Sequence, residues 1–228
     1  MIIDCIADLH GHLPKLQGGD LLIVAGDLTA RDTLPEYSKF MQWLWEQKYK
    51  KKIFIAGNHD NKLEAYLKEG DPFANSECEY LKHSGTKFRD LNIWGSPWTS
   101  RFEGINPHCC AFTGKNDAEI APHFDSIPTD IDILITHSPP FTIRDKTTCG
   151  KQVGSVALMA HHISRLRPKL WVFGHIHEDY GQDGPYQWSG TQYVNASHVN
   201  ERYQPVNKPI RIILEETPES QGAESGKD

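Results

Sequence analysis

Short apolar runs, each bounded by polar or turn-forming residues, recur along the chain and predict β-strands. Several are apolar on consecutive residues, which is the pattern of strands that are covered on both faces of a sheet. Eight such runs occur at residues 2–7, 21–25, 52–56, 91–95, 132–135, 169–173, 191–195 and 210–214. We therefore expect a core built on sheets whose strands are buried on both sides.

Two segments between the apolar runs have the periodicity of amphipathic helices. In the segment at residues 33–49, Thr33 and Glu36 have the spacing of a capping box at a helix N-terminus. The apolar residues that follow share one helical face and are Tyr37, Phe40, Met41 and Leu44. In the segment at residues 154–168, Ser155 is a candidate N-cap and Pro168 ends the pattern. Its predicted apolar stripe consists of Val156, Met159, Ile163 and Leu166.

The order of these elements predicts the fold class. Strand and helix alternate up to about residue 68, closely spaced strands follow, and then strand, helix and strand alternate again, with shorter helices at residues 62–68 and 117–123. This order is typical of an α/β (α+β) sandwich with a mixed sheet or two sheets. A chain of 228 residues is long enough for one compact domain, which we place at residues 1–216. Residues 217–228 are polar and aperiodic, which predicts a flexible C-terminal tail.

The composition narrows the classes of protein to consider. A net charge of -6 and a pI near 6.0 disfavour a protein that grips a nucleic-acid polymer along its backbone. The lysine cluster at residues 48–52 is most simply a solvated surface where a helix ends and a strand begins. No apolar run approaches the roughly 20 residues that a membrane-spanning helix needs, and the residues after Met1 lack the pattern of a leader, so we expect none. Five cysteines without zinc-type spacing indicate free thiols in a reducing compartment, so we expect a cytoplasmic protein.

Polar residues with metal-binding side chains follow five of the predicted strands. They are Asp8, His10, Asp27, Asn58, His59, His137, His175 and His177. The carboxyl ends of strands in open α/β sheets lie along one edge, so these side chains are expected to converge. Their oxygen and imidazole donors outnumber what one tetrahedral zinc takes, which favours two metal ions and a carboxylate whose two oxygens each serve one ion. Two cations about 3.5 to 4 Å apart can clamp a phosphoryl group and generate hydroxide at neutral pH.

Glycine precedes three of these positions, at Gly26, Gly57 and Gly174, and permits a close approach that a side chain would obstruct. Taken singly, each motif is better explained by a turn or a helix cap, where Asp and Asn are common. Five independent turns would rarely all carry ligand residues directly after a strand. The joint pattern therefore favours a metal site.

The remaining histidines lie outside this pattern. His161 and His162 lie on a predicted helix and are expected at the surface or at an interface. No strand end precedes the other four, which are His83, His108, His123 and His198. His12 closely follows the first motif and is either a neighbour of the substrate or a solvated loop residue.

Together the motifs resemble those of the calcineurin-like metallophosphoesterases. They are DLH (residues 8–10), GD (26–27), GNHD (57–60), THSPP (136–140) and GHIH (174–177), and their order and spacing agree along nearly the whole chain. Further stretches at residues 94–99, 167–181 and 194–197 are similar to the subfamily of metallophosphoesterase-domain-containing (MPPED-type) proteins. The resemblance implies a four-layer sandwich of two mixed β-sheets flanked by α-helices.

The resemblance also implies a role for each residue of the pattern. Asp8, His10 and His177 would hold the first metal ion and Asn58, His137 and His175 the second, with Asp27 bridging the two ions. His59 would not be a ligand. Together with Asn58 it would contact the substrate, and it would assist the leaving oxygen while a bridging hydroxide attacks phosphorus. Asp60 would support the loop or orient His59.

Two divalent or mixed-valence ions are expected, with manganese or iron as the main candidates and zinc as the alternative. The expected activity is hydrolysis of a small phosphodiester, with cyclic nucleotides among the candidate substrates. The second block reads GDLTARD (residues 26–32) and lacks the GDxxDRG arrangement of relatives that dephosphorylate proteins, which disfavours a protein phosphatase.

Two other functions remain open at this point. One is a phosphomonoesterase. The other is a weakly active protein that acts mainly as a regulatory or binding protein, because some subfamily members lack the first histidine of GHIH. That histidine is present here as His175, which favours a complete dinuclear site. We expect no membrane partner. The sequence gives no indication of the oligomeric state, and it assigns no role to Asn195, which begins an N-glycosylation motif.

Overall fold

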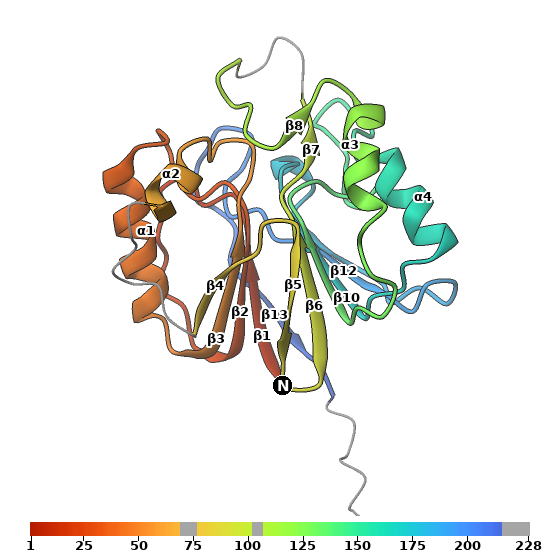
Figure 1. Cartoon of the computed structure of the whole chain (residues 1–228), viewed down its shortest axis with the longest axis horizontal. Coiled ribbons are helices and arrows are strands. Elements are labelled where there is room, and N and C mark those ends of the chain that lie inside the picture. Colours follow the sequence, from red (N-terminus) through yellow and green to blue (C-terminus); the bar gives the residue numbers. More distant parts are fainter. Residues whose placement is uncertain (69–76, 102–106, 216–228) are drawn as a thin grey trace, which may run out of the picture.

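The computed structural model of the chain describes residues 1–68, 77–101 and 107–215. Two large β-sheets face each other, and helices cover the outer face of each sheet (Figure 1). The tail predicted at residues 217–228 lies outside the described residues. Within the described ranges, no helix combines the length and the apolar character that crossing a membrane requires.

The first sheet has five strands in the order β13-β1-β2-β3-β4. Strands β1 to β4 run parallel to one another, and β13 is antiparallel to β1 at the edge. The strands are β1 (Ile2–Ile6), β2 (Gly19–Ala25), β3 (Tyr49–Ile55), β4 (Cys78–Tyr80) and β13 (Ile210–Ile213). Because β1, β2 and β3 are parallel, the loops that follow them leave the sheet at the same edge.

The second sheet has six strands in the order β11-β12-β10-β9-β6-β5, with four parallel central strands and an antiparallel strand at each edge. The strands are β5 (Ser84–Phe88), β6 (Leu91–Ser96), β9 (Ile133–Thr136), β10 (Leu170–Phe173), β11 (Gly181–Asp183) and β12 (Gln192–Asn195). A short parallel pair, β7 (Thr99–Ser100) and β8 (Thr113–Gly114), follows β6.

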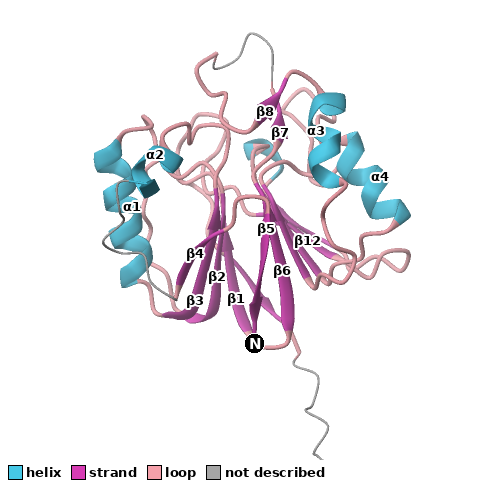
Figure 2. Ribbon diagram, in the orientation of Figure 1, coloured by secondary structure: helices cyan, strands magenta, loops and turns pink. Residues whose placement is uncertain are grey.

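Helices α1 (Leu34–Glu46) and α2 (Leu63–Lys68) cover the first sheet, and α3 (Asp117–Phe124) and α4 (Val156–Ser164) cover the second (Figure 2). Three clusters of buried apolar side chains fill the spaces between these layers, one between the sheets and one beneath each pair of helices. The predicted four-layer sandwich of two mixed sheets is therefore confirmed.

Each predicted strand corresponds to a strand of the structure, and the apolar face predicted for α1 is buried. The five strands that the pattern did not single out, β4, β5, β7, β8 and β11, have two to five residues each. All five cysteines lie in the described part of the chain and are free thiols, as predicted.

The face predicted for α4 is partly wrong. Val156 and Ile163 are 57% and 61% exposed, whereas Leu158 and His162 face the second sheet and are fully buried. His162 was expected at the surface or at an interface, but it is part of the core. Its Nδ1 lies 2.8 Å from the Leu166 carbonyl oxygen and its Nε2 lies 2.5 Å from the Tyr193 hydroxyl. A buried imidazole with a partner on each ring nitrogen carries little penalty for leaving water.

The lysine cluster at residues 48–52 is also not wholly solvated. Its residues 49–52 form the start of β3, and the Lys52 side chain is only 2% exposed. The Lys52 ammonium group donates to the Trp45 carbonyl oxygen and lies 3.3 Å from a carboxylate oxygen of Glu77. The alternation of a strand turned this lysine inward, and its ammonium reaches polar groups at the sheet margin.

Candidate metal centre

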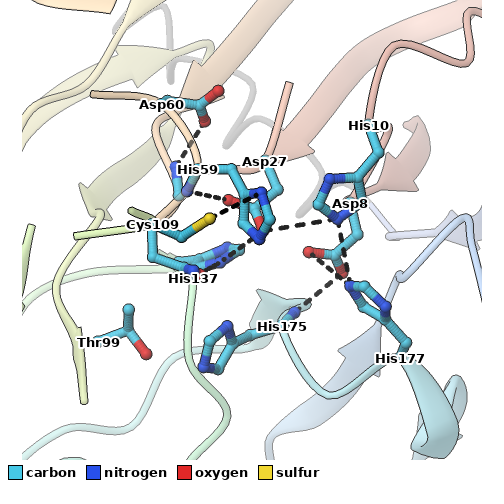
Figure 3. Close-up of polar contacts among 12 residues, drawn as sticks. Asp8, His10, Asp27, His59, Asp60, Thr99, Cys109, His137, His175 and His177 are labelled. Atoms are coloured by element: carbon cyan, nitrogen blue, oxygen red, sulfur yellow. Dashed lines mark hydrogen bonds and ion pairs between the residues drawn. The ribbon is translucent and has the colours of Figure 1, made fainter. Parts of the chain in front are cut away.

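The predicted side chains converge at one edge of the two sheets. Asp8 and His10 follow β1, Asp27 follows β2, and Asn58 and His59 follow β3. From the second sheet, His137 follows β9, while His175 and His177 follow β10, with His177 opening a short 3₁₀ helix (His177–Asp179). Figure 3 shows side chains from these strand ends pointing toward one another. The convergence expected from the sequence is therefore found.

Two groups of donor atoms lie within this cluster, and Asp27 belongs to both. Asp8, His10, Asp27 and His177 form the first group, and Asp27, His137 and His175 form the second. In each group the donor atoms lie within 4.8 Å of one another, which is close enough for a common metal ion. Asn58 adjoins the second group, because its Oδ1 lies 3.0 Å from the His137 Nε2.

The two oxygens of Asp27 have different surroundings. Oδ1 accepts a hydrogen bond of 2.9 Å from the His59 amide. Oδ2 faces both groups, at 3.6 Å from the His10 Nε2 and 3.4 Å from the His137 Nε2. The sequence predicts a carboxylate whose two oxygens each serve one ion. In the structure a single oxygen of Asp27 is turned toward both donor groups, while the other accepts from a backbone amide.

Asp8 has one oxygen that is fully hydrogen-bonded and one that is not. Oδ2 accepts from the His175 amide at 2.9 Å and from the Ser197 hydroxyl at 2.5 Å. Oδ1 is buried, has no hydrogen-bond partner among the described residues, and lies 3.8 Å from the His177 Nε2. Buried carboxylate oxygens normally have a partner. An oxygen left bare beside imidazole nitrogens suits a cation, so the residues fit a metal ion.

The backbone at the strand ends is strained. Four non-glycine residues of the cluster have positive φ angles, namely Asp8 (51°), His10 (41°), Asp27 (53°) and His175 (70°). Residues other than glycine rarely adopt this left-handed conformation, which costs of order 1 kcal/mol or more at each position. Such strain is concentrated at functional sites, because the surrounding structure forces side chains into directions that ordinary turns do not give.

The glycines predicted to allow close approach do so. A Cβ atom at Gly57 would lie 2.2 Å from Asp27 Oδ1, and one at Gly174 would lie 2.3 Å from Asp8 Oδ2. At Gly26 a Cβ would lie 2.5 Å from the His137 Nδ1. The φ angle of 96° is a second reason for glycine at this position, because residues with a side chain rarely adopt it. These three positions therefore exclude any side chain next to the cluster.

Hydrogen bonds to neighbouring groups orient the candidate ligands and the loops that carry them. The His137 Nδ1 lies 3.0 Å from the Ala25 carbonyl oxygen, which can only accept, so Nδ1 carries a proton and Nε2 is turned toward the cluster. Asn195 is fully buried and accepts from the Ser197 amide, while its side-chain amide donates to the Ile176 carbonyl oxygen between the GHIH histidines. The sequence pointed to VNAS (residues 194–197) only through a resemblance and an N-glycosylation motif, and assigned Asn195 no role. Its contacts show that it supports Asp8 and the loop of His175.

Two residues of the GNHD motif differ in their contacts. His59 is half-buried, and its Nδ1 lies 3.3 Å from the Cys109 Sγ, a neighbour that no sequence signal indicated. Asp60 accepts from the amides of Gly57 and Leu28, so it supports the loop. Burial and the charge of Asp27 raise the pKa of Asp60 to about 8.

Charges in the cluster are balanced between carboxylates and imidazoles. Burial raises the pKa of Asp8, but the histidines around it, His177 foremost, have a larger opposite effect and lower this pKa to about 2. Burial lowers the pKa of His10 to about 4 against the opposing effect of Asp27. Burial also lowers the pKa of His137, but Asp27 raises it more, to about 9. Near neutral pH the carboxylate of Asp8 is ionised and His10 is neutral, as metal binding requires.

A cavity of about 550 Å³ opens beside the cluster. Its walls include candidate ligands of both groups together with His59, Cys109 and Tyr203. A volume in this range accommodates a small molecule. A converging set of Asp and His donors beside such a cavity is typical of hydrolases that use metal ions.

Comparison with known proteins identifies the family. A sequence model described as calcineurin-like phosphoesterase matches residues 1–179. Metallophosphoesterase domain-containing protein 1 of Homo sapiens is 36% identical over 237 residues, covering 92% of this chain and 70% of that protein, and its Mus musculus counterpart gives the same values. A crystal structure aligns with a TM-score of 0.62 over 85% of this chain and 89% of its own, at 15% identity, which supports the fold alone. The chain belongs to the calcineurin-like phosphoesterase family, which implies a hydrolase acting on phosphate esters.

Proposed function

We propose that the chain is a metal-dependent phosphodiesterase that hydrolyses small phosphodiesters, cyclic nucleotides among them, at a dinuclear centre. In this proposal Asp8, His10 and His177 hold one ion, and Asn58, His137 and His175 hold the other, with Asp27 bridging them. Manganese or iron are the proposed ions and zinc the alternative, because mixed nitrogen and oxygen donors accept all three.

The observation that carries the proposal is the position of the Asp27 carboxylate. Its Oδ2 faces the His10 Nε2 of one donor group and the His137 Nε2 of the other, at 3.6 and 3.4 Å. A carboxylate oxygen shared between two groups of ligands is what a pair of closely spaced ions needs. The bare Oδ1 of Asp8 supports the same reading at the first position.

When bound, two such ions would clamp the phosphoryl oxygens and supply a hydroxide at neutral pH. The protein's own contribution to the reaction would come from His59. Its amide fixes Asp27, and its Nε2 lies 3.9 Å from the Asp27 Oδ2, so the ring borders the place where a phosphoryl group would lie. From there Nε2 can donate a proton to the leaving oxygen. Asn58 would lie beside the same group and contact the substrate.

The proposed substrate is a small molecule for two reasons. The cavity of about 550 Å³ suits one nucleotide or a similar ester. The net charge of -6 does not favour a polymer of phosphates, which proteins hold with clustered Lys and Arg.

The test is hydrolysis of bis-p-nitrophenyl phosphate before and after removal of metal with a chelator. The metal-free protein should be inactive, and Mn²⁺ should restore activity. Asp27→Ala should abolish it, whereas Asp130→Ala, which changes an exposed aspartate outside the cluster, should not. Normal turnover by Asp27→Ala would refute the assignment.

Comparison with p-nitrophenyl phosphate separates the proposed diesterase from a monoesterase. The proposal requires a higher kcat/KM for the diester. A protein with intact metal content and no turnover of either ester would instead support a mainly regulatory role.

A further inference from the structure

Tyr203 lies against the metal centre although it is not among the candidate ligands. Its ring centroid is 4.8 Å from that of His10 and 5.3 Å from that of His177, with interplanar angles of 78° and 86°. The distance to the His59 ring is longer, at 6.2 Å. Tyr203 is 41% exposed and lines the cavity, so its ring forms a wall beside the first donor group.

The backbone of Tyr203 is held in a conformation that a tyrosine rarely adopts. Its φ angle is 58°, in the left-handed region. The turn around it is closed by backbone hydrogen bonds from Tyr203 to Asn200 and from Asn200 to Gln204. The Asn200 Oδ1 accepts in addition from the amides of Arg202 and Gln204, both at 3.0 Å. An aromatic residue kept at such a position by its surroundings indicates that the direction of its ring matters.

His12 adds a second restraint and links Tyr203 to the metal-binding segment. The His12 Nε2 lies 3.2 Å from the Tyr203 carbonyl oxygen and, facing an acceptor, is the donor. His12 follows His10 by two residues, so the same loop supplies a candidate ligand and fixes the tyrosine beside it. The sequence left His12 as either a neighbour of the substrate or a solvated residue. Its contact makes it a positioning residue for Tyr203.

We infer that Tyr203 determines substrate specificity by receiving a planar aromatic group carried on the non-leaving arm of the phosphodiester. The inference rests on the proposed function, in which His59 faces the leaving oxygen. The Tyr203 ring lies closer to His10 and His177 than to His59, so it borders the other arm of the ester. Its exposed part can pack with any flat ring at centroid distances of about 4.5 to 7 Å.

The experiment keeps the leaving group constant and varies the other arm. Release of p-nitrophenolate from p-nitrophenyl phenyl phosphate and from p-nitrophenyl methyl phosphate gives a ratio of kcat/KM values for Mn²⁺-loaded protein. Tyr203→Leu should lower the phenyl-to-methyl ratio about fivefold to tenfold, as expected for loss of an aromatic pair. Tyr203→Phe should keep it within about twofold. Trp45→Leu, which removes an exposed aromatic ring on α1, should leave the ratio unchanged.

Binding provides a readout that does not depend on turnover. Calorimetry should show phenylphosphonate binding the loaded wild type more tightly than methylphosphonate, and this preference should fall in Tyr203→Leu by a similar factor. If Tyr203→Leu does not fold, Tyr203→Asn carries the same comparison, because asparagine tolerates a positive φ angle.

The outcomes separate this inference from the proposed function. Equal ratios in the wild type, Tyr203→Phe and Tyr203→Leu would overturn the inference, and so would a loss in Tyr203→Phe as large as in Tyr203→Leu. If the wild type releases no p-nitrophenolate from either diester, the proposed function fails. The phosphonate comparison then decides the role of Tyr203 alone.

Discussion

At the scale of single residues, the two oxygens of Asp27 have different roles: one is held by the backbone and the other faces the candidate metal ligands. Oδ1 is fixed by the His59 amide, and Oδ2 is left facing the imidazoles of both donor groups. His59 is thus tied to the Asp27 carboxylate by its backbone, while its largely buried ring lines the cavity. The backbone contact fixes the position of the ring, and in the proposed function the ring acts on the substrate without being a ligand.

His59→Gln should therefore lower kcat by about 10²- to 10⁴-fold, the usual contribution of a proton-transfer group. Elemental analysis should still find the metal content of the wild type. The control is His108→Gln, which changes an exposed histidine of the loop that carries Cys109 and should keep full activity. Loss of metal from His59→Gln would show that His59 is a ligand, contrary to the role proposed for it.

Ser197 should matter for metal affinity because its hydroxyl donates to the Asp8 Oδ2. Ser197→Ala leaves that oxygen with the His175 amide alone and frees Asp8 to rotate. Loss of such a supporting contact typically weakens metal binding about 10- to 100-fold. Titration calorimetry with Mn²⁺ measures the effect, with Ser164→Ala at the exposed end of α4 as the control. Equal affinities in the two variants would argue against a supporting role.

The candidate ligands could be predicted because each directly follows a strand, and strand ends of parallel strands share an edge. Asp60 was expected to support the loop or orient His59, but the contacts of Ser197 and Cys109 could not be predicted. Ser197 is 189 positions from Asp8, and Cys109 is 50 positions from His59. A hydroxyl or a thiol in a loop carries no periodic signal, so only the folded chain shows what it touches.

At the scale of elements, the start of α1 fixes the loop that follows Asp27. The Glu36 Oε2 accepts from the amides of Arg31 and Thr33 and from the Thr33 hydroxyl. A negative charge in the first turn also favours the helix dipole. One carboxylate therefore ties the loop at residues 28–33 to the helix.

Glu36→Ala should lower the free energy of unfolding by about 1 to 2 kcal/mol, because it removes the cap and leaves backbone donors without a partner. Glu46→Ala at the other end of α1 is the matched control. Glu46 is exposed and accepts only from the Gln42 side chain among the described residues, so its loss should cost less than about 0.5 kcal/mol. Urea denaturation measures both variants, and equal values would show that Glu36 does no more than an ordinary surface residue.

The helices also show when a hydrophobic pattern predicts the buried face of a helix and when it does not. For α1 every residue of the predicted apolar stripe is buried, together with Trp43, whereas Trp45 on another side of the helix is 50% exposed. Helix α4 has apolar residues on more than one side, and the side that packs on the second sheet carries Leu158 and His162, whose Nε2 contacts the Tyr193 hydroxyl. The pattern of α4 alone could not reveal that its histidine has partners for both nitrogens.

At the scale of the whole molecule, the candidate centre spans both sheets. Asp8, Asp27 and Asn58 come from the first sheet, and His137, His175 and His177 come from the second. The sheets are already joined beneath the centre, where the Ala7 amide donates to the Ala196 carbonyl oxygen and the His198 amide donates to that of Ala7. Ions held by residues of both sheets would add a further link, so metal binding should stabilise the entire fold.

This link predicts how stability should depend on metal and pH together. Without metal, the charged pair of His137 and Asp27 contributes stability that is fully present below pH 6.5, the ordinary pKa of histidine, and is lost as pH rises through about 9. A metal ion needs the neutral imidazole and must displace that proton, so its affinity should rise over the same interval. The difference in melting temperature between Mn²⁺-loaded and chelator-treated protein should therefore widen from pH 6 to pH 9. At a free Mn²⁺ concentration 100 times the Kd, the stabilisation should be about 2.7 kcal/mol. Asp27→Ala should show little of this difference at any pH, and a constant difference across the range in the wild type would mean that binding releases no proton from His137.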